Sequence, residues 1–140
     1  METLYDRLGG KDAITAVVGD FVARCAADDR INRKFARTDI GRIKTMLVDQ
    51  ICEASGGPCT YGGRDMRSTH TGMLVTGGEF DALVADLVAT LDKFNVPKAE
   101  QDELLSVLGP MRPDIVEIET SETGTALPAS YENAPPVAVA

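Results

Sequence analysis

Hydrophobic residues recur at three- and four-residue spacing along most of the chain, which is the pattern of amphipathic helices. The first long helix is predicted over residues 11–26, after the Gly9-Gly10 pair. Its apolar face consists of Ile14, Val17, Val18, Phe21, Val22 and Cys25. A short helical turn that holds Ile31 and Phe35 is predicted to follow.

The remaining predicted elements are helices as well. A helix that begins after Thr38-Asp39 and ends before Gly56-Gly57-Pro58 carries the apolar residues Ile40, Ile43, Met46, Leu47 and Ile51. Thr76 and Glu79 form a capping-box pattern at the start of the next helix, which ends at Asn95. Its apolar stripe is Phe80, Leu83, Val84, Leu87, Val88, Leu91 and Phe94. The fold class indicated is therefore all-α.

The last predicted helix begins at Pro97 and is expected to kink at Pro110 and Pro113. Beyond Glu117 the composition shifts to Thr, Ser, Ala and Pro, with three acidic residues as its only charges. We expect a folded domain over residues 1–117 and a disordered acidic tail over residues 118–140, because such a composition buries little apolar surface.

Charge and composition exclude several classes of partner. The net charge of −8 repels phosphate backbones and anionic lipid surfaces, so neither nucleic acid nor membrane is an expected partner. The chain has no apolar run of membrane-spanning length and no signal-peptide pattern at its start, so a cytoplasmic location is expected. The three cysteines Cys25, Cys52 and Cys59 lack a C-x-x-C pair, and this pattern favours reduced thiols over a disulfide framework or a zinc site.

His70 is the only histidine, and it lies in a methionine-rich stretch. Helical spacing would place Met66, His70, Met73 and Leu74 on one face. A histidine on an apolar face has two interpretations. It is either a core residue whose ring nitrogens are hydrogen-bonded, or a ligand of a metal or haem iron.

A series of motifs occurs in a fixed order along the chain. These motifs are LYDRLGG, A-I-x-x-V-V-x-D-F, A-D-D-R-I-x-x-x-F, G-G-P and Y-x-G-R-x-M-x-x-x-H, followed by a Phe-led helix that ends in V-P. Together they resemble the group I truncated haemoglobins over roughly residues 2–117. The resemblance implies a two-over-two helical sandwich around a non-covalently bound haem b, with diatomic gases as ligands.

The resemblance also implies roles for particular residues. His70 matches the proximal iron ligand, Phe35 matches a phenylalanine that stacks on the haem, and Phe21 backs the distal pocket. Arg64 has two interpretations, as a partner of a haem propionate or as a solvated loop arginine. The full set of expected haem-contacting residues is Val22, Phe35, Ile43, Met46, Leu47, Ile51, Tyr61, Arg64, Met66, His70, Phe80 and Val84.

The departures from the family pattern concern the side that faces a bound gas. Val22 stands where group I members usually carry a tyrosine, and Leu47 where a glutamine is common. With Ile43 beside them, none of these three side chains donates a hydrogen bond. O2 gains more from a donor than CO does, so this pocket is expected to favour CO and NO relative to O2.

Met46 opens an alternative function. Several relatives carry an internal sixth iron ligand at this position, and a thioether is a good ligand for haem iron. Met46 is thus either a distal ligand in a His/Met electron-transfer or gas-sensing haem protein, or a gap-filling core residue. A helical interaction module without haem, an enzymatic activity such as nitric oxide dioxygenation, and a reductase partner stay open as well. A monomer or weak dimer is expected.

Overall fold

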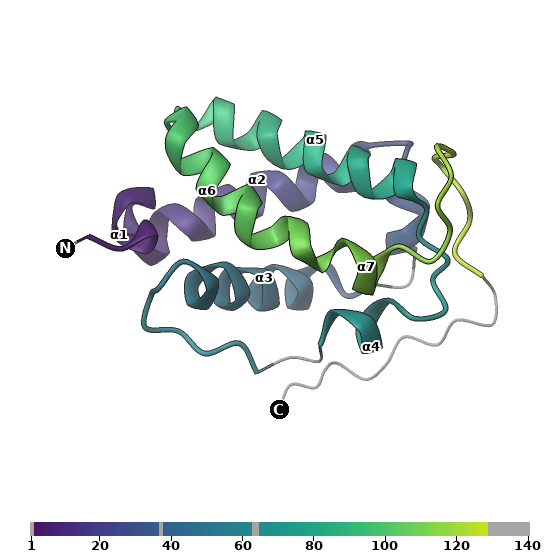
Figure 1. The fold of residues 1–140 in the computed structure, drawn as a ribbon, viewed down its shortest axis with the longest axis horizontal. Coiled ribbons are helices and arrows are strands. Elements are labelled where there is room, and N and C mark those ends of the chain that lie inside the picture. The colour runs from purple at the N-terminus through teal and green to yellow at the C-terminus, as the bar shows by residue number, and fades with distance from the viewer. Residues whose placement is uncertain (1, 37, 63–64, 129–140) are drawn as a thin grey trace.

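The computed structural model describes residues 2–36, 38–62 and 65–128, and the helical elements found there agree with an all-α fold (Figure 1). The α-helices are α1 (Leu4–Leu8), α2 (Gly10–Ala27), α3 (Ile40–Ala54), α4 (Met66–His70), α5 (Gly77–Lys93), α6 (Lys98–Leu108) and α7 (Arg112–Ile115). Two 3-10 helices, η1 (Asn32–Phe35) and η2 (Gly109–Met111), complete the set.

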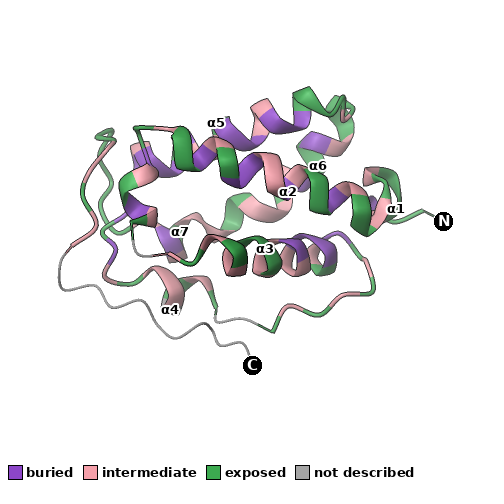
Figure 2. Ribbon diagram, turned by 180° about the vertical axis from the view of Figure 1, so that it is seen from behind, coloured by how far each residue is buried: buried purple, intermediate pink, exposed green. Residues whose placement is uncertain are grey.

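The core forms around α2, which packs against both α3 and α5. Buried residues line the inward faces of these helices and exposed residues their outward faces (Figure 2). Val18, Cys52, Leu91 and Leu104 are almost completely buried in the main apolar cluster. A second cluster of Met73, Val75, Phe80 and Ile115 lies where α4, α5 and α7 approach one another.

Local signals explain most helix ends. The predicted capping box is confirmed at α5: the Thr76 hydroxyl accepts from the Glu79 N–H, and the Glu79 carboxylate accepts from the Thr76 N–H. Asp39 caps α3 by accepting from the Arg42 N–H. Asn95 adopts a left-handed conformation with φ 58° after α5, which asparagine tolerates better than most residues.

The observed helices differ from the predicted ones in three places. α1 was not predicted, because five residues are too few to show a periodic pattern. The helix that carries His70 ends at His70, so Leu74 is exposed and does not share a face with His70. The last predicted helix is divided into α6, η2 and α7, since Pro110 and Pro113 interrupt its hydrogen bonding.

The segment after α7 differs from the disordered tail that its composition suggested. We call residues 117–127 the C-terminal strap. The strap passes along the start of α5 (Figure 1), where the Gly77 and Gly78 N–H groups donate to the Ile118 and Thr120 carbonyls at 3.0 and 2.9 Å. A Cβ at Gly78 would overlap the Ser121 carbonyl oxygen, so only glycine permits this approach. Residues 129–140 of the expected tail lie outside the described residues.

The cysteines also differ from the expectation of reduced thiols. Cys52 and Cys59 form a disulfide with a Cα–Cα distance of 5.6 Å, while Cys25 is free and buried. Gly56, Gly57 and Pro58 lie between the two half-cystines and turn the chain back toward α3. Spacing alone did not reveal this pairing, because the turn brings together residues that no sequence motif links.

Two features are absent from the described residues. None of their helices has both the length and the hydropathy needed to span a membrane. No group of three or more His, Cys, Asp or Glu side chains among them could hold a metal ion.

Candidate functional site

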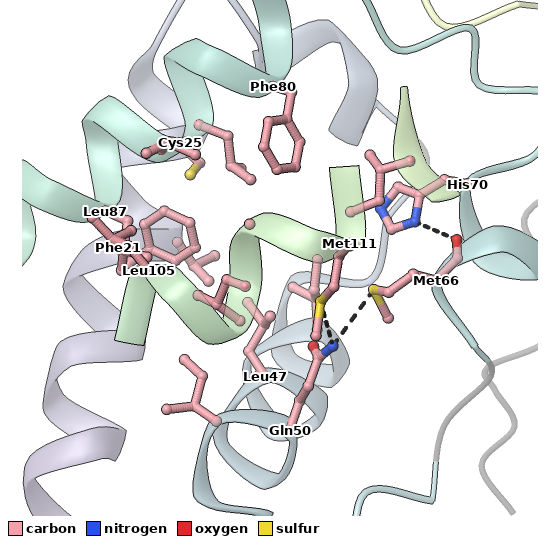
Figure 3. Close-up of a pocket in the computed structure, with 18 of the residues that line it drawn as sticks. Phe21, Cys25, Leu47, Gln50, Met66, His70, Phe80, Leu87, Leu105 and Met111 are labelled. Atoms are coloured by element: carbon pink, nitrogen blue, oxygen red, sulfur yellow. Dashed lines mark hydrogen bonds between the residues drawn. The ribbon is translucent and has the colours of Figure 1, made fainter. Parts of the chain in front are cut away.

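A cavity of about 240 Å³ lies between α3 and α4 and extends to α2, α5 and α6 (Figure 3). Its lining is almost entirely aliphatic, aromatic or sulfur-containing. Nine of the twelve residues expected to contact haem lie in this lining: Val22, Phe35, Ile43, Leu47, Ile51, Met66, His70, Phe80 and Val84.

His70 is held at the end of α4, with its ring in the cavity lining (Figure 3). Its Nδ1 lies 2.8 Å from the Met66 carbonyl oxygen. A carbonyl only accepts, so we assign the proton to Nδ1, which leaves the lone pair on Nε2 at the other side of the ring. Burial lowers the pKa of His70 below its ordinary value, so the ring is neutral near pH 7. A neutral imidazole with one fixed nitrogen is suited to bind a metal ion through the other.

Another part of the cavity wall comes from α2 and α3. Ile43, Leu47 and Ile51 project from α3 at intervals of four residues, and Val22 projects from α2. None of these four side chains carries a hydrogen-bond donor.

Gln50 is a polar member of the same α3 face, and sequence reasoning missed it. Its Nε2 lies 3.5 Å from the Met66 sulfur and 3.7 Å from the Met111 sulfur (Figure 3). Thioether sulfur is a weak acceptor. A signal existed, since Gln50 follows Leu47 by three residues and Ile43 by seven, the spacing of one helix face.

Three of the expected haem contacts are placed elsewhere or not described. Met46 is half-buried and does not belong to the cavity lining formed by the described residues. The Tyr61 side chain does not line it either, and the Tyr61 N–H donates to the Glu53 carboxylate at 3.3 Å. Arg64 lies outside the described residues.

Sequence reasoning also missed part of the lining. Cys25 from α2, Leu87 from α5, and Leu105, Leu108, Met111 and Ile115 from the last helical region face the cavity as well. Periodicity marked most of these residues as apolar, but it could not separate cavity-facing positions from ordinary core positions.

These residues fit a haem. The cavity offers apolar and aromatic walls to a flat porphyrin, and one neutral imidazole nitrogen to its iron. Phe35 from η1 and Phe80 from α5 supply the aromatic surfaces.

The chain is similar in sequence to a known protein family. The family model for bacterial-like globins matches residues 3–117. A group 1 truncated haemoglobin of Mycolicibacterium paratuberculosis is 34% identical over 122 residues, which cover 87% of this chain and 88% of the relative. Another, from Synechocystis, is 36% identical over 113 residues, which cover 78% of this chain and 91% of the relative. This chain belongs to the group 1 truncated haemoglobins.

Solved structures of this family share the fold. The Fe(III) form of the truncated haemoglobin from Tetrahymena pyriformis superposes with a TM-score of 0.79 at 33% identity, covering 82% of this chain and 98% of that one. A Synechococcus 2/2 haemoglobin with covalently attached haem gives a TM-score of 0.78 at 34% identity, with the same coverage. The truncated globin fold of this chain is thereby shown, and haem is the cofactor that the family implies.

Proposed function

We propose that this truncated haemoglobin holds haem b non-covalently through His70 and binds diatomic gases reversibly, with CO and NO favoured relative to O2. The haem iron would supply the gas-binding position when haem is bound. The observation that carries the proposal is the part of the cavity wall formed by α2 and α3, where Val22, Ile43 and Leu47 present only hydrocarbon to the cavity.

Each part of the site has a defined role in this proposal. His70 Nε2 would hold the iron, and the Met66 carbonyl orients the ring through Nδ1. Phe35 and Phe80 would pack on the porphyrin and exclude water from the cavity. Val22, Ile43 and Leu47 contribute no hydrogen bond to a bound gas, and the Gln50 amide on the same α3 face donates to the Met66 and Met111 sulfurs. Charged or polarised ligands depend on such a bond more than CO does.

Installing donors in this wall is expected to slow O2 dissociation. Val22→Tyr combined with Leu47→Gln places a hydroxyl and an amide in the cavity, and hydrogen bonds to charged groups are worth about 1.5–3 kcal/mol. At 1.36 kcal/mol per factor of ten, O2 should leave about ten- to a hundredfold more slowly, with a smaller change for CO. Stopped-flow displacement of O2 by CO measures the rate.

The matched control is Val22→Phe combined with Leu47→Met, which fills similar space without a donor. Equal slowing in both double variants would show that bulk, rather than hydrogen bonding, controls O2 release. Retention of O2 by the parent for as long as by the Tyr/Gln variant would contradict the proposal.

The His/Met electron-transfer alternative depends on Met46. Since Met46 lies outside the cavity lining, we expect a five-coordinate, high-spin ferrous spectrum for the parent and the same spectrum for Met46→Leu. Leucine keeps the volume and removes the sulfur, so stability should change by less than about 1.5 kcal/mol. A low-spin ferrous parent that becomes high-spin in Met46→Leu would favour the alternative.

A further inference from the structure

Glu117 lies directly beyond α7, and its carboxylate reaches the turn that follows His70. Oε1 accepts from the Leu74 N–H at 2.8 Å and from the Gly72 N–H at 3.1 Å, while Oε2 accepts from the Gly72 N–H at 3.2 Å. The backbone of Glu117 is fixed as well, because its own N–H donates to the Val75 carbonyl at 2.9 Å. Glu117 therefore spans the turn over residues 72–75.

This turn needs such support. Gly72 and Leu74 both have left-handed backbones, with φ 92° and 57°. Leucine rarely adopts that conformation unless its surroundings impose it. Here the carboxylate of Glu117 binds the Leu74 N–H directly.

The helix that carries His70 depends on its neighbours in the same way. α4 has five residues, too few to be stable alone. Its side chains are tied to α3 through Met66 and Gln50, and to α7 through the ion pair of Arg67 and Asp114 at 2.8 Å. Glu117 supplies the corresponding tie on the C-terminal side of His70.

The charge of Glu117 also acts on the ring. Its carboxylate binds the Gly72 N–H, two residues after His70, so the negative charge lies on the same turn that ends the His70 helix. Solvent weakens the interaction of this charge with the ring, because Glu117 is exposed.

We propose that Glu117 is a positioning residue for the proximal histidine: its carboxylate fixes the turn after His70, and its negative charge lowers the reduction potential of the haem iron. The second effect follows because a nearby anion stabilises ferric iron more than ferrous iron. The inference rests on the proposed function, since it requires iron on His70.

Two substitutions separate geometry from charge. Glu117→Gln keeps an oxygen at the Oε1 position, which accepts from both Gly72 and Leu74, but removes the charge. Glu117→Leu removes both the accepting oxygen and the charge. Glu119→Gln is the matched control: it removes the same charge two residues away, where the side chain pairs with Arg112 and not with the turn.

We expect Glu117→Gln to raise the reduction potential of the haem protein while haem transfer to excess apomyoglobin stays within about twofold of the parent rate. Glu117→Leu should raise the potential and also speed haem transfer about tenfold, because the turn loses charge-assisted hydrogen bonds. The Fe–His stretching band of the ferrous protein should broaden or shift in Glu117→Leu. Glu119→Gln should leave all three measurements near the parent values.

Equal shifts of potential in Glu117→Gln and Glu119→Gln would overturn the electrostatic role. Parent-like haem transfer in Glu117→Leu would overturn the positioning role. If Glu117→Leu fails to fold, the two glutamine variants still decide the charge effect. A parent chain that binds no haem would refute the proposed function instead. Amide exchange at Leu74 would still test the turn, since it should be faster in haem-free Glu117→Leu than in the haem-free parent and Glu117→Gln.

Discussion

His70→Ala is expected to abolish stable haem incorporation. His70 is the only histidine in the chain, and its ring is the nitrogen donor that the described cavity lining offers to iron. Alanine also removes the hydrogen bond to the Met66 carbonyl, so neither the ligand nor its orientation survives. The purified variant should lack a Soret band, and added imidazole should restore part of it by entering the space that the ring vacates.

Met73→Leu is the matched control for this variant. Met73 lies three residues after His70 and is buried in the second cluster, outside the cavity lining. Leucine conserves its volume, so haem content should be preserved. Unchanged haem content and spectrum in His70→Ala would refute the whole assignment of the site.

Glu79→Ala is expected to lower the free energy of unfolding far more than the loss of an exposed ion pair does. Glu79 and Lys34 are 2% and 4% exposed, and Oε1 of Glu79 lies 3.7 Å from Nζ of Lys34. Oε2 accepts from the Thr125 N–H and hydroxyl at 2.7 and 2.6 Å. Removing one partner of a buried pair leaves the other charge uncompensated and typically costs about 3–5 kcal/mol. Since whole domains are stable by about 5–15 kcal/mol, urea unfolding should register a large shift.

Two comparisons make this prediction specific. Asp81→Ala breaks an ion pair between Asp81 and Arg112, in which the Asp81 side chain is 70% exposed. Such exposed pairs contribute at most about 1 kcal/mol to the free energy of unfolding. The double variant Lys34→Met with Glu79→Leu removes both charges together and should cost less than the sum of the two single changes. A Glu79→Ala variant no less stable than Asp81→Ala would show that the pair is not a determinant of stability.

The effect should extend to the haem site. Lys34 directly precedes Phe35, and Glu79 directly precedes Phe80, and both phenylalanines line the cavity. The strap closes over the pair through three bonds from Lys34 Nζ, to the Thr125 carbonyl and hydroxyl and to the Ala126 carbonyl. Haem loss from Glu79→Ala should therefore be faster than from the parent.

The sequence predicted the helices where local signals were strong. The stripe from Phe80 to Leu91 and the capping box at Thr76 lie within one element, so spacing alone identified α5. The site was predictable to the extent that the family motifs carried it. Val22, Phe35 and His70 come from different elements, and only the resemblance linked them before the structure placed them around one cavity.

The features that the sequence did not predict depend on contacts between distant segments. The strap contributes few apolar side chains, and its order comes from bonds to backbone groups at Gly77, Gly78 and Arg30 and to the side chains of Lys34 and Glu79. Cys52 and Cys59 meet because of a turn, and Gln50 faces the cavity in a stripe that otherwise looks apolar. Composition and periodicity describe one segment at a time, so they contain little information about such pairs.

The strap also sets the order in which a newly made chain can complete its structure. Thr125 follows Glu79 by 46 residues and Lys34 by 91. Both members of the buried pair therefore leave the ribosome well before Thr125, which binds them in the folded chain. Chains fold as segments emerge, at roughly 5–20 residues per second. His70 and every described residue of the cavity wall precede the strap as well. The nascent globin therefore has every described side chain of the cavity wall before Thr125 can close the structure over Lys34 and Glu79, so this closing step follows the synthesis of the wall.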